Sequence, residues 1–245
     1  MPDVDQLLRG LEFSGYQRLV LPSGQVIPGR DLSPLADLVF PETLEGKTVL
    51  DIGCYYGYFL HNAVERGALR AVGLEPDARR FHVASTLAPL WKGRIEVRQK
   101  TIVELEPGET FDYVLFLRVL HHVADPIHAM KIVADHCRGV AMVMFREPQN
   151  IQFAAEALRG SSRPAMTARL KARLQSSALG LLGRNLGIIG VGSAASDRGF
   201  YFNQKAFLNT FLIHQPLFKD ITFRPTHKPG LTLAVCRAGR ISPER

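Results

Sequence analysis

The sequence contains little cysteine and no long uninterrupted apolar segment. Its three cysteines lie far apart, and no two of them have the spacing of metal ligands (Cys54, Cys137 and Cys236). An odd number of scattered cysteines argues against a disulfide framework and is typical of a protein of the reducing cytoplasm. Arg184 and Asn185 interrupt the longest apolar run, residues 179–191, which is shorter than the roughly 18 residues of a membrane span. We therefore expect a cytoplasmic protein without a membrane span.

Signals for secretion and for metal binding are also missing. Residues 1–5 are acidic and lack the apolar segment of a secretory signal. Apart from the adjacent pair His121 and His122, six histidines occur, and none has the His-x-x-x-His spacing that, with a nearby acid, holds a metal ion. These are His61, His82, His128, His136, His214 and His227. The sequence therefore predicts no metal site.

The composition that is present is that of an ordinary globular protein. Of 245 residues, 46% are apolar and 22% are charged, which excludes a disordered tail and a collagen-like repeat. The net charge of +7 permits nucleic acid or an acidic surface as a partner without requiring one. The length suits one large domain, or one domain with an insertion.

Short apolar strands alternate with helical stretches from residue 47 onward. Strands are expected at 48–52, 71–74, 94–98, 111–117 and 140–145, and helices at 59–66, after Pro76-Asp77 and at 127–137. A helix at 205–213 precedes two more strands, 220–224 and 231–237, expected as an antiparallel pair at the edge. This alternation predicts an α/β fold, Rossmann-like and doubly wound, with a mainly parallel seven-stranded sheet.

The remaining segments predict two additions to this sheet. Residues 3–11 read as an amphipathic helix and residues 16–27 as a hairpin, so 1–46 are expected to form an N-terminal cover. Residues 150–198 carry seven Lys or Arg and two acids, a net charge of +5. We expect this segment to be a helical cap inserted into a domain made of 47–149 and 199–245.

The loop after the first strand of the domain is the strongest candidate for a binding site. Gly53 and Gly57 let the backbone turn sharply and approach a ligand closely. Asp51 places a carboxylate just before the turn, and Glu75 ends the next strand, where an acid can accept hydrogen bonds from both ribose hydroxyls. Ligands of open α/β sheets bind beyond the carboxyl ends of the strands. The pattern therefore predicts a ligand that contains a nucleoside.

Two nucleotide classes do not fit this loop. A Gly-x-Gly-x-x-Gly fingerprint counted from Gly53 would place glycines at 55 and 58, and both positions are Tyr. A pyrophosphate would therefore meet a bulky side chain. No Lys-Ser or Lys-Thr pair follows the turn, which excludes a P-loop.

The same loop resembles motif I of the class I S-adenosylmethionine-dependent methyltransferases. Residues 49–54 and 57–59 match that motif, and 73–76 match the motif whose acid holds the ribose. The resemblance covers about residues 47–147 and implies S-adenosylmethionine as the cofactor and S-adenosylhomocysteine as the product. It implies these cofactor-binding residues: Asp51, Gly53, Cys54, Tyr55, Gly57, Glu75, Pro76, Thr101, Ile102 and Leu117.

The chain departs from the family pattern at two positions. Tyr55 replaces the usual middle glycine, and Thr101 stands where an Asp is common, so we expect backbone groups to contact the adenine amino group. Cys54 is expected to be a small buried residue. Upstream, residues 21–24, 28–29 and 44–47 resemble the lead-in of the tRNA wobble-uridine (5-oxyacetate) methyltransferase group and its small-molecule relatives. That likeness does not separate RNA from small-molecule substrates.

Residues 111–126 resemble the fourth-strand motif that borders the reaction centre in this family. His122 is the candidate base, since an imidazole can accept a proton near neutral pH; the alternative is a histidine that bonds a nearby turn or carbonyl. His121 is expected to face elsewhere. Arg118 is the candidate contact to an acidic substrate group, and the alternative is a salt bridge with Glu75, Asp112 or Glu147.

Arg146 and Glu147 end the fifth strand and are candidate substrate-binding residues, with ion pairing as the alternative. The basic charge of the cap would suit either phosphates or the solvated face of a lid. Phe153 and Phe200 stand only at its borders, and this scarcity of aromatics disfavours binding to single-stranded RNA.

The hypothesis is methyl transfer from S-adenosylmethionine to O or N of a small molecule. The alternatives are a tRNA-modifying methyltransferase of the wobble-uridine type, and a non-catalytic donor-binding protein that acts through a partner.

Overall fold

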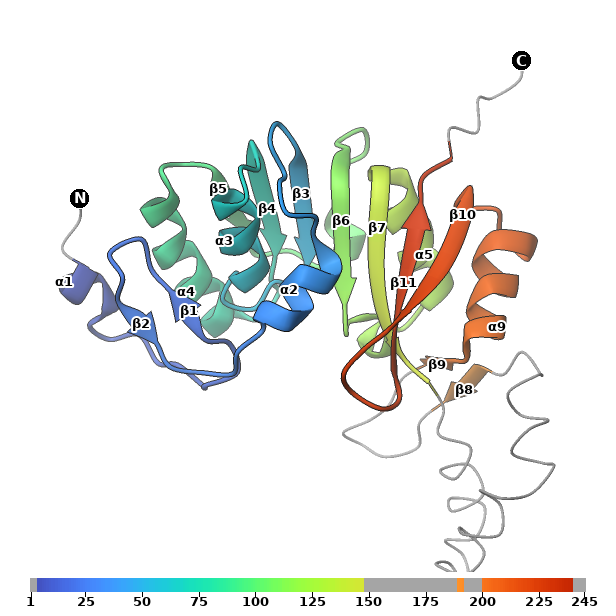
Figure 1. Cartoon of the computed structure of the whole chain (residues 1–245), viewed down its shortest axis with the longest axis horizontal. Coiled ribbons are helices and arrows are strands. Elements are labelled where there is room, and N and C mark those ends of the chain that lie inside the picture. Colours follow the sequence, from blue (N-terminus) through green and yellow to red (C-terminus); the bar gives the residue numbers. More distant parts are fainter. Residues whose placement is uncertain (1–3, 148–188, 192–199, 240–245) are drawn as a thin grey trace, which may run out of the picture. The chain divides into compact units, whose positions relative to one another are not determined.

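The computed structural model describes residues 4–147, 189–191 and 200–239 (Figure 1). The chain divides into two compact units, one of Met1–Leu117 with Lys131–Met142 and the other of Arg118–Met130 with Val143–Arg245. The predicted cap, 150–198, lies outside the described residues except for strand β8 (Ile189–Val191). The domain boundaries that we drew around that cap therefore stay predictions.

A seven-stranded, mostly parallel sheet confirms the predicted fold class. Its strand order is β10-β11-β7-β6-β3-β4-β5. The strands are β3 (Thr48–Ile52), β4 (Arg70–Leu74), β5 (Ile95–Arg98), β6 (Phe111–Leu117), β7 (Cys137–Arg146), β10 (Asp220–Pro225) and β11 (Leu231–Arg237). Their apolar side chains are buried, as expected of strands covered on both faces.

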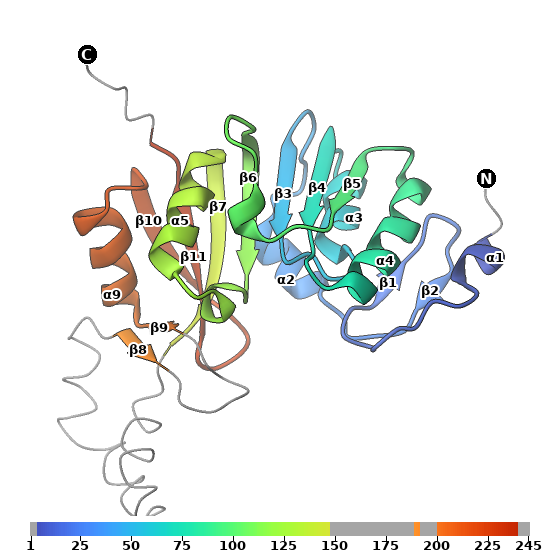
Figure 2. The ribbon, with the colours of Figure 1, turned by 180° about the vertical axis from the view of Figure 1, so that it is seen from behind.

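In the first unit, β3 pairs in parallel with both β4 and β6, and β4 pairs in parallel with β5. Helix α3 (Tyr58–Glu65) lies against β3 and β4, and α4 (Ala78–Leu87) lies against β5 (Figure 2). Asp77 begins α4 because its carboxylate accepts the N–H groups of Arg79 and Arg80, at 3.1 and 3.0 Å. The carboxyl ends of β3, β4 and β5 therefore lie next to one another at one edge of the sheet.

Three short helical segments complete this unit: α2 (Ser33–Val39) and the 3₁₀ turns η1 (Ala88–Trp91) and η2 (Ile102–Glu104). The predicted hairpin is confirmed, since β1 (Leu19–Val20) pairs antiparallel with β2 (Val26–Ile27). The helix predicted over 3–11 is shorter in the structure, where α1 spans Val4–Leu8. Gly10, two residues later, has a positive φ of 87°, a conformation that ends helices.

Helix α5 (Pro126–Asp135) also ends earlier than we expected from 127–137. Cys137 already belongs to β7, because the N–H of Phe111 donates to the C=O of His136 at 2.8 Å and pairing with β6 begins there.

In the second unit, the antiparallel pair β10–β11 is confirmed, with β10 at the edge of the sheet. The predicted helix over 205–213 divides into α9 (Gln204–Leu208) and a wider π turn, η4 (Asn209–His214). Strands β8 and β9 (Phe200–Phe202) pair antiparallel, and η3 (Leu120–His122) is a 3₁₀ turn. The core of this unit is aromatic, with four buried rings that contact one another: Phe145, Phe202, Phe207 and Phe211.

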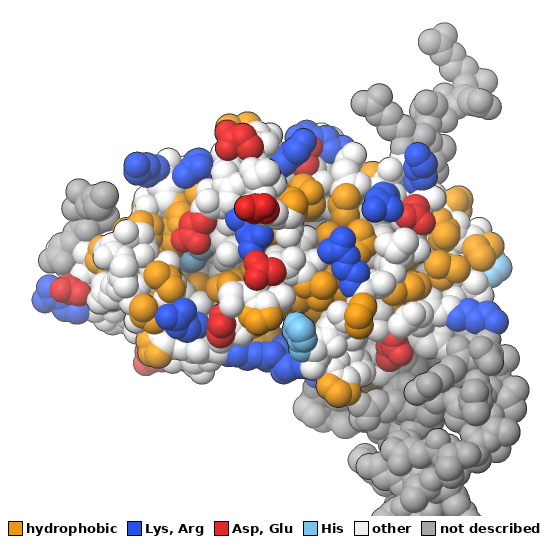
Figure 3. Space-filling view, viewed as in Figure 1, with side chains coloured by type: hydrophobic (Ala, Val, Ile, Leu, Met, Phe, Trp, Pro, Cys, Tyr) orange, Lys and Arg blue, Asp and Glu red, His pale blue; other side chains and the backbone are white. Residues whose placement is uncertain are grey.

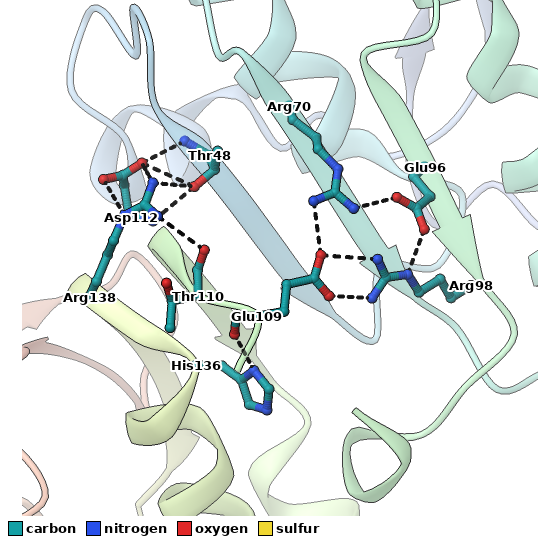
Figure 4. Close-up of polar contacts among 9 residues, drawn as sticks. All are labelled: Thr48, Arg70, Glu96, Arg98, Glu109, Thr110, Asp112, His136 and Arg138. Atoms are coloured by element: carbon teal, nitrogen blue, oxygen red, sulfur yellow. Dashed lines mark hydrogen bonds and ion pairs between the residues drawn. The ribbon is translucent and has the colours of Figure 1, made fainter. Parts of the chain in front are cut away.

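Charged side chains pair with one another across the strands of the first unit (Figure 4). Glu109 accepts two hydrogen bonds from Arg98, at 2.6 and 3.1 Å, and one from Arg70 at 2.9 Å. Asp112 accepts from Arg138 and from the backbone and hydroxyl of Thr48. These contacts hold the pKa of both carboxyls below their usual range, mainly through the arginine partner.

We predict that Glu109→Gln lowers the free energy of unfolding by about 1 kcal/mol at pH 7, because a bidentate pair is replaced by a neutral amide. The pKa of Glu109 falls from its ordinary 4.5 to about 2. Its contribution is therefore complete above pH 4.5 and is lost as the pH falls toward 2. Urea denaturation at several pH values measures the difference. Glu106→Gln is the control, since Glu106 is 74% exposed, and an equal effect of both changes would contradict the prediction.

Candidate functional site

The loop between β3 and α3 folds back on the end of β4. The N–H groups of Gly53 and Cys54 both donate to the C=O of Leu74, at 2.8 and 2.9 Å. The C=O of Cys54 accepts from the N–H of Gly57 at 2.9 Å, which closes a four-residue turn. Gly53 and Gly57 have φ angles of 78° and 89°, in the left-handed region that a glycine adopts without strain.

Tyr55 occupies the left-handed region too, with φ 59°, at the position where the family pattern has glycine. This conformation costs about 1–2 kcal/mol for a residue with a side chain. The Tyr55 N–H donates to Oε2 of Glu75 at 2.9 Å, and its ring lies 4.8 Å from the ring of Tyr16 and 4.8 Å from the guanidinium of Arg80. These contacts offset the strain of the backbone.

Asp51 and Glu75 are buried carboxyls at the carboxyl ends of adjacent strands. Asp51 is 2% exposed and Glu75 is 3% exposed. Glu75 accepts the N–H groups of Tyr55 and Asp77, and its pKa is raised by burial. Oδ2 of Asp51 has no hydrogen-bond partner among the described residues, and burial together with the charge of Glu75 raises its pKa to about 8. Such a pair is suited to a ligand that carries positive charge and hydroxyl donors.

Cys54 packs closely against Gly73 of β4. It is 1% exposed, and burial raises the pKa of its thiol well above the usual value. A Cβ at Gly73 would lie 2.7 Å from the Cys54 sulfur and 2.6 Å from Leu60, so a larger residue at that point of β4 would require these side chains to move. The expectation that Cys54 is a small buried residue is confirmed.

The other candidate residues of the first unit follow β4 and β5 or end β6, and they differ in burial. The N–H and hydroxyl of Thr101 donate to Oε2 of Glu104, at 2.7 and 2.6 Å, so its side chain caps the turn η2. Ile102 is buried, Pro76 is exposed and Leu117 is half-buried. The N–H of Glu75 donates to the C=O of Arg98 at 3.1 Å, which places the end of β5 beside that of β4. The unit therefore gathers the first-loop residues and Glu75 around one point.

Sequence reasoning missed Gln17, which contacts the loop directly. It is 4% exposed, and its Oε1 accepts the N–H groups of Tyr56 and Tyr58. No motif marks this residue. Hairpin alternation is the signal that could have found it, since Gln17 shares the inward face with Leu19 and Leu21.

The other candidates belong to the second unit. Arg118 has a φ of 62°, and its N–H donates to the C=O of Met144 at 3.1 Å. The N–H of His122 donates to the C=O of Val119. The rings of His121 and His122 have centroids 4.0 Å apart. The expectation that these two side chains point apart is therefore wrong, because the 3₁₀ turn η3 brings neighbouring rings together.

Glu147 is held by neutral donors at the end of β7. Its Oε1 accepts the side-chain amide of Gln204 at 3.1 Å and the hydroxyl of Thr232. Its N–H donates to the C=O of Gly230. Arg146, the preceding residue, is half-buried. The roles of Arg118, His122, Arg146 and Glu147 toward a substrate stay predictions.

The described residues contain neither a metal-ligand cluster nor a helix long and apolar enough to span a membrane. No group of three His, Cys, Asp or Glu side chains comes together there as metal ligands. Within the same part of the chain, none of the helices combines the length and the apolar character that a membrane span requires.

Comparison with known proteins assigns a family to this arrangement. The family model of a methyltransferase domain matches residues 27–179. A ubiquinone biosynthesis O-methyltransferase of Rhizobium etli is 44% identical over 104 residues, 42% of this chain and 42% of that protein. A tRNA U34 carboxymethyltransferase of Campylobacter hominis is 36% identical over 89 residues, 36% of this chain and 31% of that protein. The chain thus matches less than half the length of these relatives.

The fold also matches solved structures. A Burkholderia thailandensis 1,6-didemethyltoxoflavin-N1-methyltransferase, solved with 1,6-didemethyltoxoflavin and S-adenosylhomocysteine, aligns with a TM-score of 0.57 at 15% identity. The alignment covers 84% of this chain and 77% of that one. The family model matches more than half of the chain, and the predicted resemblance is confirmed. The chain belongs to the methyltransferase-domain family.

Proposed function

We propose that this chain binds S-adenosylmethionine in the first unit and transfers its methyl group to O or N of a small molecule. The observation that carries the proposal is the buried pair of Asp51 and Glu75 beside the turn that follows β3. Both carboxyls are almost fully buried, and Asp51 keeps an oxygen without a partner among the described residues. Buried polar atoms without a partner are rare in a folded protein, and one at the carboxyl end of a parallel strand, where ligands of open α/β sheets bind, supports a site completed by a ligand.

The chemistry of the pair fits this donor. Glu75 would accept the ribose hydroxyls, because each of its oxygens receives one backbone N–H and retains further acceptor capacity. Asp51 would face the ammonium of the methionine part. Gly53, Cys54, Tyr55 and Gly57 would line the turn around it, with Pro76, Thr101, Ile102 and Leu117 at the neighbouring strand ends. When bound, S-adenosylmethionine supplies a methyl group already activated by a positively charged sulfur.

The protein's own contribution is then to align the acceptor and exclude water. His122 would accept a proton if the acceptor must lose one. Arg118, Arg146 and Glu147 would contact polar groups of the acceptor. The Rhizobium etli relative is named as an O-methyltransferase of ubiquinone biosynthesis, which supports a small-molecule acceptor.

We predict that Glu75→Ala weakens binding of S-adenosylhomocysteine about 100-fold. The change removes two charge-assisted hydrogen bonds to the ribose, each worth about 1.5 kcal/mol. Isothermal titration calorimetry at pH 7.5 measures the affinity. Glu106→Ala is the matched control, because Glu106 is an exposed acid of the same unit. Equal affinities of wild type and Glu75→Ala would remove Glu75 from the site.

A second prediction concerns the pH dependence of donor binding. The pKa of Asp51 is about 8 in the free protein, so near pH 7 this carboxyl is mostly protonated. Pairing with an ammonium requires the ionised form, and binding therefore releases close to one proton at pH 7. The affinity for S-adenosylhomocysteine should rise with pH between about 6 and 8, with a slope approaching one.

Calorimetry at pH 7 in buffers of different ionisation enthalpy measures the released proton directly. Asp51→Asn should abolish the release, because the amide does not titrate. A wild-type binding heat that does not depend on the buffer would show that Asp51 does not ionise on binding.

A tRNA acceptor is the second candidate function, since one relative is named a tRNA U34 carboxymethyltransferase. Figure 3 shows acidic and basic side chains interspersed over the described surface on its visible face. Residues 150–198 carry most of the net charge and are therefore the segment that the tRNA test addresses.

We predict that release of S-adenosylhomocysteine from S-adenosylmethionine is stimulated by a low-mass fraction of a cell extract and not by bulk tRNA. A gel shift with bulk tRNA at low and moderate salt provides the complementary measurement. Salt-sensitive binding that is lost when Arg169, Lys171 and Arg173 are neutralised would instead favour the tRNA acceptor. Donor binding without methyl transfer to either fraction would favour the non-catalytic alternative.

A further inference from the structure

Gln17 makes three hydrogen bonds to the loop that follows β3, although it precedes that loop by about forty residues. Its Oε1 accepts the N–H of Tyr56 at 3.1 Å and the N–H of Tyr58 at 3.3 Å, and its Nε2 donates to the C=O of Cys54 at 3.4 Å. The side chain is 4% exposed. Every polar atom of this buried amide therefore bonds the backbone of the loop.

These are backbone groups that the loop cannot satisfy by itself. Tyr58 begins helix α3, and the first N–H groups of a helix have no partner within it. Gly57, at the cap position, has no side chain with which to accept them. Gln17 thus performs for α3 what a capping side chain performs for other helices.

The hairpin holds Gln17 at this place. The N–H of Arg18 donates to the C=O of Arg30 at 2.9 Å, and the N–H of Arg30 donates to the C=O of Gly15 at 3.0 Å. A Cβ at Gly29 would overlap the backbone of Gln17, so glycine allows the two sides of the hairpin to close there. Leu19 and Leu21 are buried on the same inward face.

Aromatic contacts reinforce the same junction. The backbone N–H of Ser14 donates to the Tyr56 hydroxyl at 3.3 Å, and that hydroxyl donates to the C=O of Glu12. Phe13 packs edge-on against Tyr56, with ring centroids 5.8 Å apart. The junction between the N-terminal segment and the loop is therefore fixed by side chains from both.

We propose that Gln17 is a positioning residue for the donor: it holds the loop from Cys54 to Tyr58 in the conformation that binds S-adenosylmethionine. This inference rests on the proposed function. The Tyr55 N–H that bonds Glu75 lies between the groups that Gln17 holds, so a loop released by Gln17 also loosens its contact with the ribose-binding acid. When only a fraction of the molecules has the competent loop, the apparent affinity falls by that fraction.

The test compares Gln17→Met with Gln25→Met. Methionine has the length of glutamine but offers no amide, and Gln25 is an exposed glutamine of the same hairpin. We expect Gln17→Met to bind S-adenosylhomocysteine at least about tenfold more weakly, as the loss of several neutral hydrogen bonds predicts. The KM for the donor should rise by a similar factor, while kcat at saturating donor changes by less than about twofold. Gln25→Met should resemble wild type.

Amide hydrogen exchange provides a second measurement, and its first part needs only the wild-type protein. We expect the N–H groups of Tyr56 and Tyr58 to be protected before any ligand is added. Gln17→Met should lose this protection at these two amides and keep it in β3 and β4.

The outcomes separate the inference from the function. Wild type that binds S-adenosylhomocysteine, with equal binding by Gln17→Met, overturns the inference and leaves the proposed function standing. Fast exchange of Tyr56 and Tyr58 in the free wild-type protein also overturns it. Wild type that does not bind S-adenosylhomocysteine overturns both. A Gln17→Met protein that melts lower yet binds with unchanged affinity shows a purely structural role and overturns the positioning role.

Discussion

The hydrogen bond from the Tyr55 N–H to Glu75 is the contact on which the candidate site depends. At 2.9 Å it joins the loop after β3 to the end of β4. It gives the buried carboxyl of Glu75 one of its hydrogen-bond donors. It also holds Tyr55 in a left-handed conformation that a residue with a side chain otherwise avoids. Because β3 and β4 run parallel and end together, this bond and the two from Gly53 and Cys54 to Leu74 fix the position of the loop relative to the second acid.

The first unit contains two kinds of carboxyl group, one paired with arginine and one buried without a salt bridge. Glu109 and Asp112 have arginine partners, and both remain ionised at low pH. Asp51 and Glu75 have no salt bridge among the described contacts, and burial raises the pKa of each. The first arrangement stabilises the folded chain. The second leaves carboxyls that gain most from a cationic ligand, which is the difference expected between a structural ion pair and a binding site.

The sequence allowed the sheet and the first loop to be predicted because both follow from local patterns. An apolar strand, the spacing of two glycines and an acid at a strand end can each be recognised within a stretch of a few residues. Hairpin alternation could place Gln17 on the buried face of the hairpin, but not predict its bonds to the loop, because its partners lie about forty positions later. The paired rings of His121 and His122 do not follow from the sequence for a different reason: their orientation depends on a 3₁₀ turn, in which neighbouring side chains come together.

The tyrosine at position 55 connects these observations. A glycine there would turn without strain, and the loop would need little support from elsewhere. Tyr55 turns at a cost of about 1–2 kcal/mol, and the groups that offset this cost come from outside the loop: Glu75, Tyr16 and Arg80. Gln17 then holds the residues on either side. In this chain the geometry of the loop is therefore a property of the hairpin and the sheet together, and the family motif describes only the part of the site that is contiguous in sequence.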